Sequence, residues 1–70
     1  MTVYKTYVKM IFNRGTLWED YDIVPYSEIE HNYLARAKWE CQEAKKQGYD
    51  AYIKAYDSND ESEYYIVKGV

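Results

Sequence analysis

The side chains best suited by type and spacing to metal chemistry lie in the acidic stretch of residues 57–63. This stretch supplies oxygen ligands at alternating positions, as in the first half of a calcium-binding loop. Such a loop also needs a glycine at its sixth position and a bidentate glutamate at its twelfth, and both are missing. The single histidine, His31, and the single cysteine, Cys41, do not make a zinc site. We therefore predict that the chain holds no metal ion or other cofactor.

Catalysis by side chains would need a nucleophile beside a base, or two carboxylates in a cleft. The carboxylates close to one another in the sequence are Glu28 with Glu30, and Asp20 with Asp22. Helix capping accounts for the first pair, and protection of a strand edge accounts for the second. The three glycines are isolated, so no glycine-rich phosphate loop is present. The sequence predicts a protein that is not an enzyme.

Composition narrows the class of protein further. The net charge of −3 and the pI of about 5.0 argue against phosphate binding over the whole surface. The 70 residues predict a single domain, residues 1–70, whose small core favours self-association. Ten tyrosines and two tryptophans against one phenylalanine suit half-exposed surfaces, because their rings carry a polar group. The lone cysteine and the lack of an apolar leader or membrane-length segment predict a cytoplasmic protein without membrane contact.

The most regular element is residues 27–48, whose periodicity predicts a helix from about residue 28 to residue 47. Ser27 takes the N-cap position, and Glu30 three residues later completes a capping box. Gly48, after two lysines, can adopt the left-handed conformation that ends a helix. Helical spacing defines a buried face, which consists of Ile29, Tyr33, Ala37, Cys41, Ala44 and, at its edge, Leu34.

The opposite side of this helix is polar, with the large indole of Trp39 at its centre. One interpretation is that Trp39 covers the stems of Arg36 and Glu43 or reaches a sheet edge. The other is that Trp39, with Ala35 one turn earlier, is an anchor for a protein partner or a second copy. The second interpretation is supported by the over-representation of tryptophan among interface hot spots. We give the two interpretations equal weight.

Alternating residues predict four strands, at residues 2–12, 16–24, 49–57 and 62–70. In the first strand, the even residues from Tyr4 to Phe12 are expected to face the helix. In the third, Ala51 and Ala55 leave room for a helix to lie close. The inward set of the second strand is predicted to be Leu17, Tyr21 and Ile23, and its outward set Trp18, Asp20 and Asp22. The order ββαββ predicts an α+β fold, a two-layer sandwich with one helix on an antiparallel sheet of about four strands.

The sheet face away from the helix should then be rich in tyrosine and lysine. Its expected members are Lys5, Tyr7, Lys9, Trp18, Tyr52, Lys54 and Tyr56, with either Tyr64 and Lys68 or Tyr65. Aromatic residues of this kind suit a protein interface. They also suit single-stranded nucleic acid, with bases stacked on Tyr7, Tyr52 and Tyr56 and lysines along the backbone. A third possibility is a solvated sheet face with no ligand, since tyrosine favours strands.

In size, acidity, tyrosine content and lack of catalytic motifs, the chain is similar to the very small proteins with which phages and mobile elements inhibit host machinery, anti-CRISPR proteins among them. This resemblance implies a non-catalytic module that binds a host nucleic-acid-processing or defence enzyme. An acidic cluster could then imitate phosphates, although the sequence favours a solvated hairpin loop as its explanation: Asp57, Asp60, Glu61 and Glu63. We expect a protein partner and a homodimer. The alternatives are a single-stranded nucleic-acid binder and a homodimeric accessory protein with no ligand.

Overall fold

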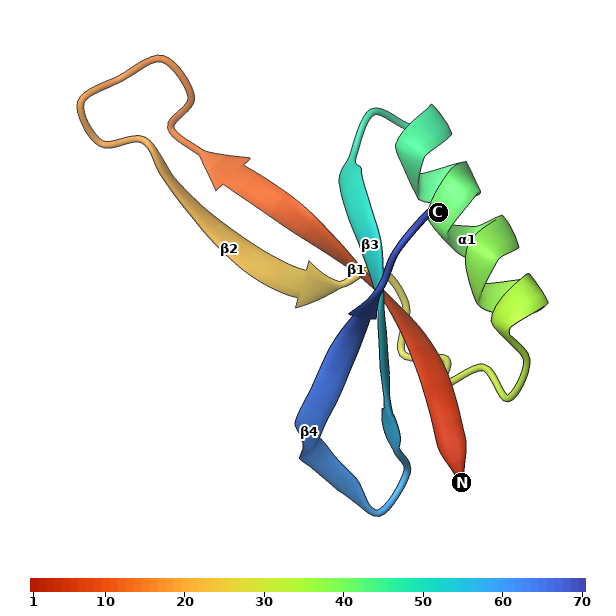
Figure 1. Cartoon of the computed structure of the whole chain (residues 1–70). Coiled ribbons are helices and arrows are strands. Elements are labelled where there is room, and N and C mark those ends of the chain that lie inside the picture. Colours follow the sequence, from red (N-terminus) through yellow and green to blue (C-terminus); the bar gives the residue numbers. More distant parts are fainter.

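The computed structural model describes all 70 residues and contains four strands and one helix. In chain order these are β1 (Thr2–Phe12), β2 (Asp20–Pro25), α1 (Leu34–Lys46), β3 (Asp50–Asp57) and β4 (Asp60–Val67). Every strand pair is antiparallel, and the strand order in the sheet is β2-β1-β3-β4. Figure 1 shows the single helix against one side of a strongly twisted sheet. The predicted α+β fold with ββαββ order is confirmed.

The long strand β1 organises the sheet. Its first part, Thr2 to Lys9, pairs with β3, whereas its second part, Tyr7 to Phe12, pairs with β2. The β3–β4 hairpin therefore pairs mainly with the first half of β1, and β2 pairs with the second half. The β1–β2 hairpin extends beyond the helix (Figure 1). The molecule is accordingly elongated, with extents of 43 × 26 × 20 Å.

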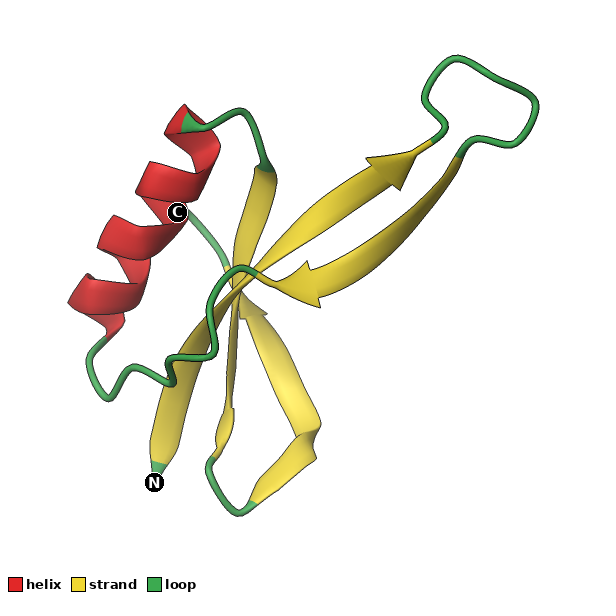
Figure 2. Ribbon diagram, turned by 180° about the vertical axis from the view of Figure 1, so that it is seen from behind, coloured by secondary structure: helices red, strands yellow, loops and turns green.

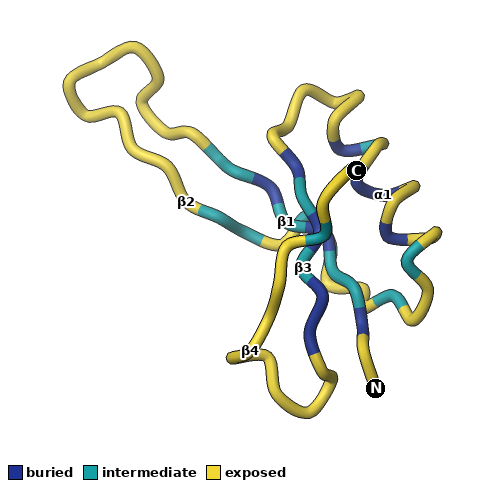
Figure 3. Tube along the Cα trace, viewed as in Figure 1, coloured by how far each residue is buried: buried dark blue, intermediate teal, exposed yellow.

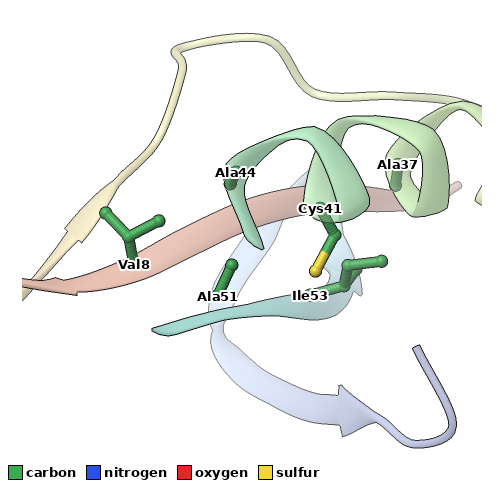
Figure 4. Packing of buried hydrophobic residues seen from close by; sticks show 6 residues of the cluster. All are labelled: Val8, Ala37, Cys41, Ala44, Ala51 and Ile53. Atoms are coloured by element: carbon green, nitrogen blue, oxygen red, sulfur yellow. The ribbon is translucent and has the colours of Figure 1, made fainter. Parts of the chain in front are cut away.

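The core lies between α1 and the two central strands. Its buried residues are Val8, Ala37, Cys41, Ala44, Ala51 and Ile53 (Figure 4). Four of the six are alanine or cysteine, and such small side chains allow the helix to lie close to the sheet. Thr6 and Val8 are buried as expected for the even residues of β1, and Ala37, Cys41 and Ala44 form the predicted helical face. Cys41 is a buried free thiol whose pKa is raised by burial.

The helix begins at Leu34, six residues later than the sequence predicts, so the predicted capping box is wrong. The backbone of His31 exchanges two hydrogen bonds of 2.8 Å with Tyr4, which places it beside β1 in an extended conformation. Figure 2 shows this loop following the first half of β1 before the helix starts. The actual N-cap, Tyr33, has no side-chain cap. Ile29 and Tyr33, expected in the core, are 57% and 69% exposed.

The helix ends as predicted. Gly48 has φ of +93°, in the left-handed region that favours glycine. Its N–H donates to the Lys45 carbonyl, and the N–H of Tyr49 donates to the Ala44 carbonyl. These two bonds form a Schellman motif, which satisfies carbonyls at the helix end and directs the chain into β3.

The predicted second strand differs from the structure in its start and in its faces. Residues 13–19 form a loop, and Leu17 and Trp18 lie exposed in it, so neither belongs to the sheet. The register pairs Tyr21 with Ile11, and Ile23 with Lys9, which places both on the face away from the helix. Asp20, Asp22 and Val24 are on the helix side. The outer part of this hairpin is exposed on both faces (Figure 3), so burial does not select a face there.

Strand β4 begins at Asp60, two residues before its predicted start. Its register with β3 decides the question of faces that the sequence leaves open. Ala55 pairs with Tyr65, and Lys54 pairs with Ile66. Tyr65 therefore points to the helix side, while Tyr64 and Ile66 lie on the open face.

Candidate functional site

A hollow of about 560 Å³ lies along the outer side of α1, and we call it the Trp39 groove. It is lined by Ile29, His31, Ala35, Arg36, Trp39 and Glu40. The late start of the helix creates it, because the irregular loop places Ile29 opposite the first turns of α1 rather than in the core. Trp39 is 66% exposed, and α1 contacts only β1 and β3, the two central strands of the sheet. Arg36 forms no ion pair within the chain.

The groove has a buried polar floor. The carboxylate of Glu40, a residue only 8% exposed, accepts a 2.9 Å hydrogen bond from the Ser27 hydroxyl. Its other oxygen lies 3.2 Å from Nε2 of His31, within ion-pair distance but without the geometry of a hydrogen bond. The carboxylate thus stands between the hydroxyl and the imidazole. In a nucleophilic triad the imidazole stands between the other two groups, so His31 does not contact the Ser27 hydroxyl as a base. The three residues instead fasten the loop to the helix.

Three of the predicted partner-binding residues, Ala35, Arg36 and Trp39, come together in the groove. Glu43 does not line it, and its carboxylate lies 3.3 Å from the Lys46 ammonium group. Sequence reasoning missed Ile29, His31 and Glu40 as groove residues. The apparent capping box concealed Ile29 and His31, because it assigned their loop to the helix.

The second candidate surface is the open side of the sheet. We call it the Tyr–Lys face and define it by Lys5, Tyr7, Lys9, Tyr21, Tyr52, Lys54 and Tyr64. The five of these on β1 and β3 lie where the sequence places them. Trp18 is off the sheet. Tyr56 is on this side but only 4% exposed, because it packs beside Val3 and its hydroxyl donates to Glu30.

On the Tyr–Lys face, the rings and ammonium groups contact one another. Tyr7 and Tyr52 stack with their ring centroids 6.1 Å apart. The ammonium group of Lys54 lies 4.3 Å from the ring centroids of both Tyr7 and Tyr64, and that of Lys9 lies 4.4 Å from Tyr21. Burial raises the pKa of Tyr52, with smaller contributions from the Tyr64 and Tyr7 hydroxyls.

The third predicted contact region, the acidic β3–β4 hairpin, uses two of its carboxylates internally. Asp57 accepts hydrogen bonds from the Asn59 N–H at 2.8 Å and from the N-terminal amine at 3.2 Å. These contacts hold the pKa of Asp57 below its usual 3.8, the Asn59 N–H contributing most. Asp60 accepts from the N–H and hydroxyl of Ser62. Of these four acidic residues, only Glu61 and Glu63 form no hydrogen bond or ion pair within the chain.

Comparison with protein-family models, with curated proteins and with solved structures found no match. No three His, Cys, Asp or Glu side chains gather where they could ligate a metal ion. The one helix lacks the length and apolarity to cross a bilayer.

Proposed function

We propose that this chain is a small non-catalytic protein-binding module and that the Trp39 groove is its contact site. The observation that carries the proposal is the meeting of exposed Trp39 and Ile29, from separate elements, in one hollow. Tryptophan and arginine dominate interface hot spots, and hot spots lie in pockets surrounded by a polar rim. Here Arg36 supplies an unpaired charge at the apolar hollow.

The groove also indicates what the partner presents. Its apolar walls fit an aliphatic or aromatic side chain, and the free Arg36 guanidinium fits a carboxylate beside that side chain. The buried Glu40 and the loop tied to it hold the groove open before binding, which lowers the ordering cost of association. The similarity of the chain in size and composition to phage inhibitors supports a host nucleic-acid-processing or defence enzyme as that partner.

The test compares the two exposed tryptophans. The tagged protein is used to capture partners from bacterial lysate, beside Trp39→Ala, Ile29→Ala and, as the matched control, Trp18→Ala. We expect one protein to be captured by the parent chain and by Trp18→Ala, but not by the two groove variants. Trp18 is 79% exposed, so the control removes a ring that is at least as accessible. Equal capture by all four proteins would overturn the proposal.

A homodimer remains a prediction of the sequence, motivated by the small core and the exposed aromatic residues. Sedimentation at micromolar concentration distinguishes a dimer from a monomer of 8.4 kDa. If the groove binds a second copy, Trp39→Ala converts the dimer to a monomer and Trp18→Ala does not. If the dimer survives Trp39→Ala, the second copy binds elsewhere and the groove stays available for a different partner.

A further inference from the structure

The feature that the proposed function leaves unexplained is a like-charged pair at the centre of the sheet. Lys5 of β1 and Lys54 of β3 are directly opposite each other in the antiparallel register. Directly opposed like charges destabilise a sheet. Neither lysine is well neutralised: Lys54 has no ion pair, and Lys5 lies 3.6 Å from Glu28, whose side chain is 90% exposed. Within the chain, the ammonium group of Lys54 is held by the rings of Tyr7 and Tyr64 rather than by a carboxylate.

The positive charges continue along β1. Lys9 also has no ion pair, and it follows Lys5 and Tyr7 at alternate positions, at steps of about 6.8 Å. Three ammonium groups therefore share one face of a protein whose net charge is −3. Asp50 of β3 is opposite Lys9 on the same face, so the three lysines leave a local excess of positive charge, which suits an anion.

The rings around these lysines specify the kind of anion. Tyr7 and Tyr52 come from the two central strands and stack on each other, while Tyr21 on β2 and Tyr64 on β4 are 59% and 52% exposed. Sheets that bind single-stranded nucleic acid stack bases on such aromatic residues while cations follow the backbone. An acidic peptide would form ion pairs with the lysines, but its carboxylates would not stack on the row of tyrosine rings.

We infer that the Tyr–Lys face binds single-stranded nucleic acid, with Lys5, Lys54 and Lys9 each neutralised by a backbone phosphate. Bases then stack on the exposed rings of Tyr21 and Tyr64, on either side of the Tyr7–Tyr52 pair. The site is on the opposite side of the sheet from α1 and does not depend on the Trp39 groove.

The test is fluorescence anisotropy with a labelled, mixed-sequence single strand of about 10 nucleotides, as DNA and as RNA. With three phosphates neutralised, affinity should fall about twentyfold between roughly 50 and 200 mM salt. Lys54→Gln should lower the slope of log affinity against log salt by about 0.7. Lys38→Gln is its matched control, because it removes the same charge from the exposed side of α1.

Stacking is tested separately at two neighbouring tyrosines. Tyr64→Leu should weaken binding at least about fivefold, whereas Tyr65→Leu, on the other side of the same strand, should leave it unchanged. Tyr65 is 59% exposed, so the two substitutions remove comparable surface. Circular dichroism checks that each variant is folded, and Lys9→Gln replaces Lys54→Gln if the latter unfolds.

Three outcomes would overturn the inference: no binding at about 50 mM salt, equal affinity for a duplex of the same sequence, or equal loss in Tyr64→Leu and Tyr65→Leu. A duplex carries the phosphates but hides the base faces, so equal affinity would mean simple attraction to polyanions. Trp39→Ala should retain oligonucleotide binding, and Lys54→Gln should retain the protein partner, so this inference and the proposed function succeed or fail independently.

Discussion

The hydroxyl of Tyr56, on the central strand β3, donates a hydrogen bond to the carboxylate of Glu30, in the loop before α1. The bond passes over β1, where Val3 packs beside the Tyr56 ring. It therefore fastens the loop to the sheet from the open face, while the Ser27–Glu40 bond fastens the same loop to the helix.

This bond predicts a loss of stability in alkali. Burial, the hydrogen bond to Glu30 and nearby carboxylates raise the pKa of Tyr56 well above its usual 10.0. Because the folded chain holds this proton more tightly than the unfolded chain, the stabilisation is intact below pH 10.0 and is lost as the pH rises through the folded pKa. Urea unfolding from about pH 8 to pH 11 should show this decline, and Tyr56→Phe should flatten it.

At neutral pH, Tyr56→Phe should lower the free energy of unfolding by about 1 kcal/mol, through loss of the hydrogen bond. Tyr65→Phe is the control, because the Tyr65 hydroxyl has no hydrogen-bond partner in the chain. An alkaline decline that is the same in both variants would mean that Tyr56 is not responsible.

Substitution by alanine should lower the free energy of unfolding strongly at one isoleucine and hardly at all at another. Ile53 is fully buried against the helix, so Ile53→Ala should cost about 2–5 kcal/mol, a large part of the stability of so small a domain. Ile29→Ala should alter the free energy of unfolding by no more than about 0.5 kcal/mol, because Ile29 is mostly exposed. Denaturant titration measures both. A large loss of stability in Ile29→Ala would instead mean that Ile29 is part of the core, as the sequence predicts.

Ser27 offers a direct choice between the predicted capping box and the observed contact. Ser27→Ala should cost about 1–2 kcal/mol, because the carboxylate of Glu40 loses its donor. The cost should depend on Glu40: in a double-mutant cycle with Glu40→Gln, the two substitutions should couple by at least about 0.5 kcal/mol. A cycle with Glu30→Gln should show no coupling. The reverse pattern would support a helix that starts at residue 28.

The charge of the N-terminal amine should lower the measured pKa of Asp57. The pKa of this carboxyl lies below 3.8, so its contribution to stability is present above that pH and is lost as the pH falls through the folded pKa. Carbon-13 NMR of the carboxyl group should show a partial rise of the pKa toward 3.8 when the N-terminus is acetylated, since acetylation removes the charge. The Asn59 N–H retains the rest of the shift. An unchanged pKa would exclude the ion pair with Met1.

The regular elements were predictable because local pattern and burial agree in them. Ala37, Cys41 and Ala44 recur at helical spacing and meet the sheet, and Gly48 ends the helix where its backbone freedom is needed. The start of the helix depends on a backbone bridge between His31 and Tyr4, residues far apart in the sequence. No local signal encodes such a bridge, and the Ser27–Glu30 spacing imitates a cap.

The candidate sites also divide into residues whose position follows from local pattern and residues whose position depends on distant contacts. Lys5, Tyr7, Lys9, Tyr52 and Lys54 were placed correctly, because strand alternation alone decides their face. The faces of β2 were reversed, since that hairpin has no helix over it and its apolar residues are not selected by burial. The Trp39 groove was only partly visible, because Ile29 reaches it through the misassigned loop.

The central position of β1 sets the order in which the sheet can form. The β1–β2 hairpin can close between neighbours in the sequence, but the other edge of β1 must wait for its partners in β3, which lie 41 to 55 residues later. Such distant pairing slows folding, because the chain entropy of closing the loop is lost before the contact forms. During synthesis the N-terminal half of β1 therefore presents an unpaired strand edge, which is open to association with other chains until β3 arrives.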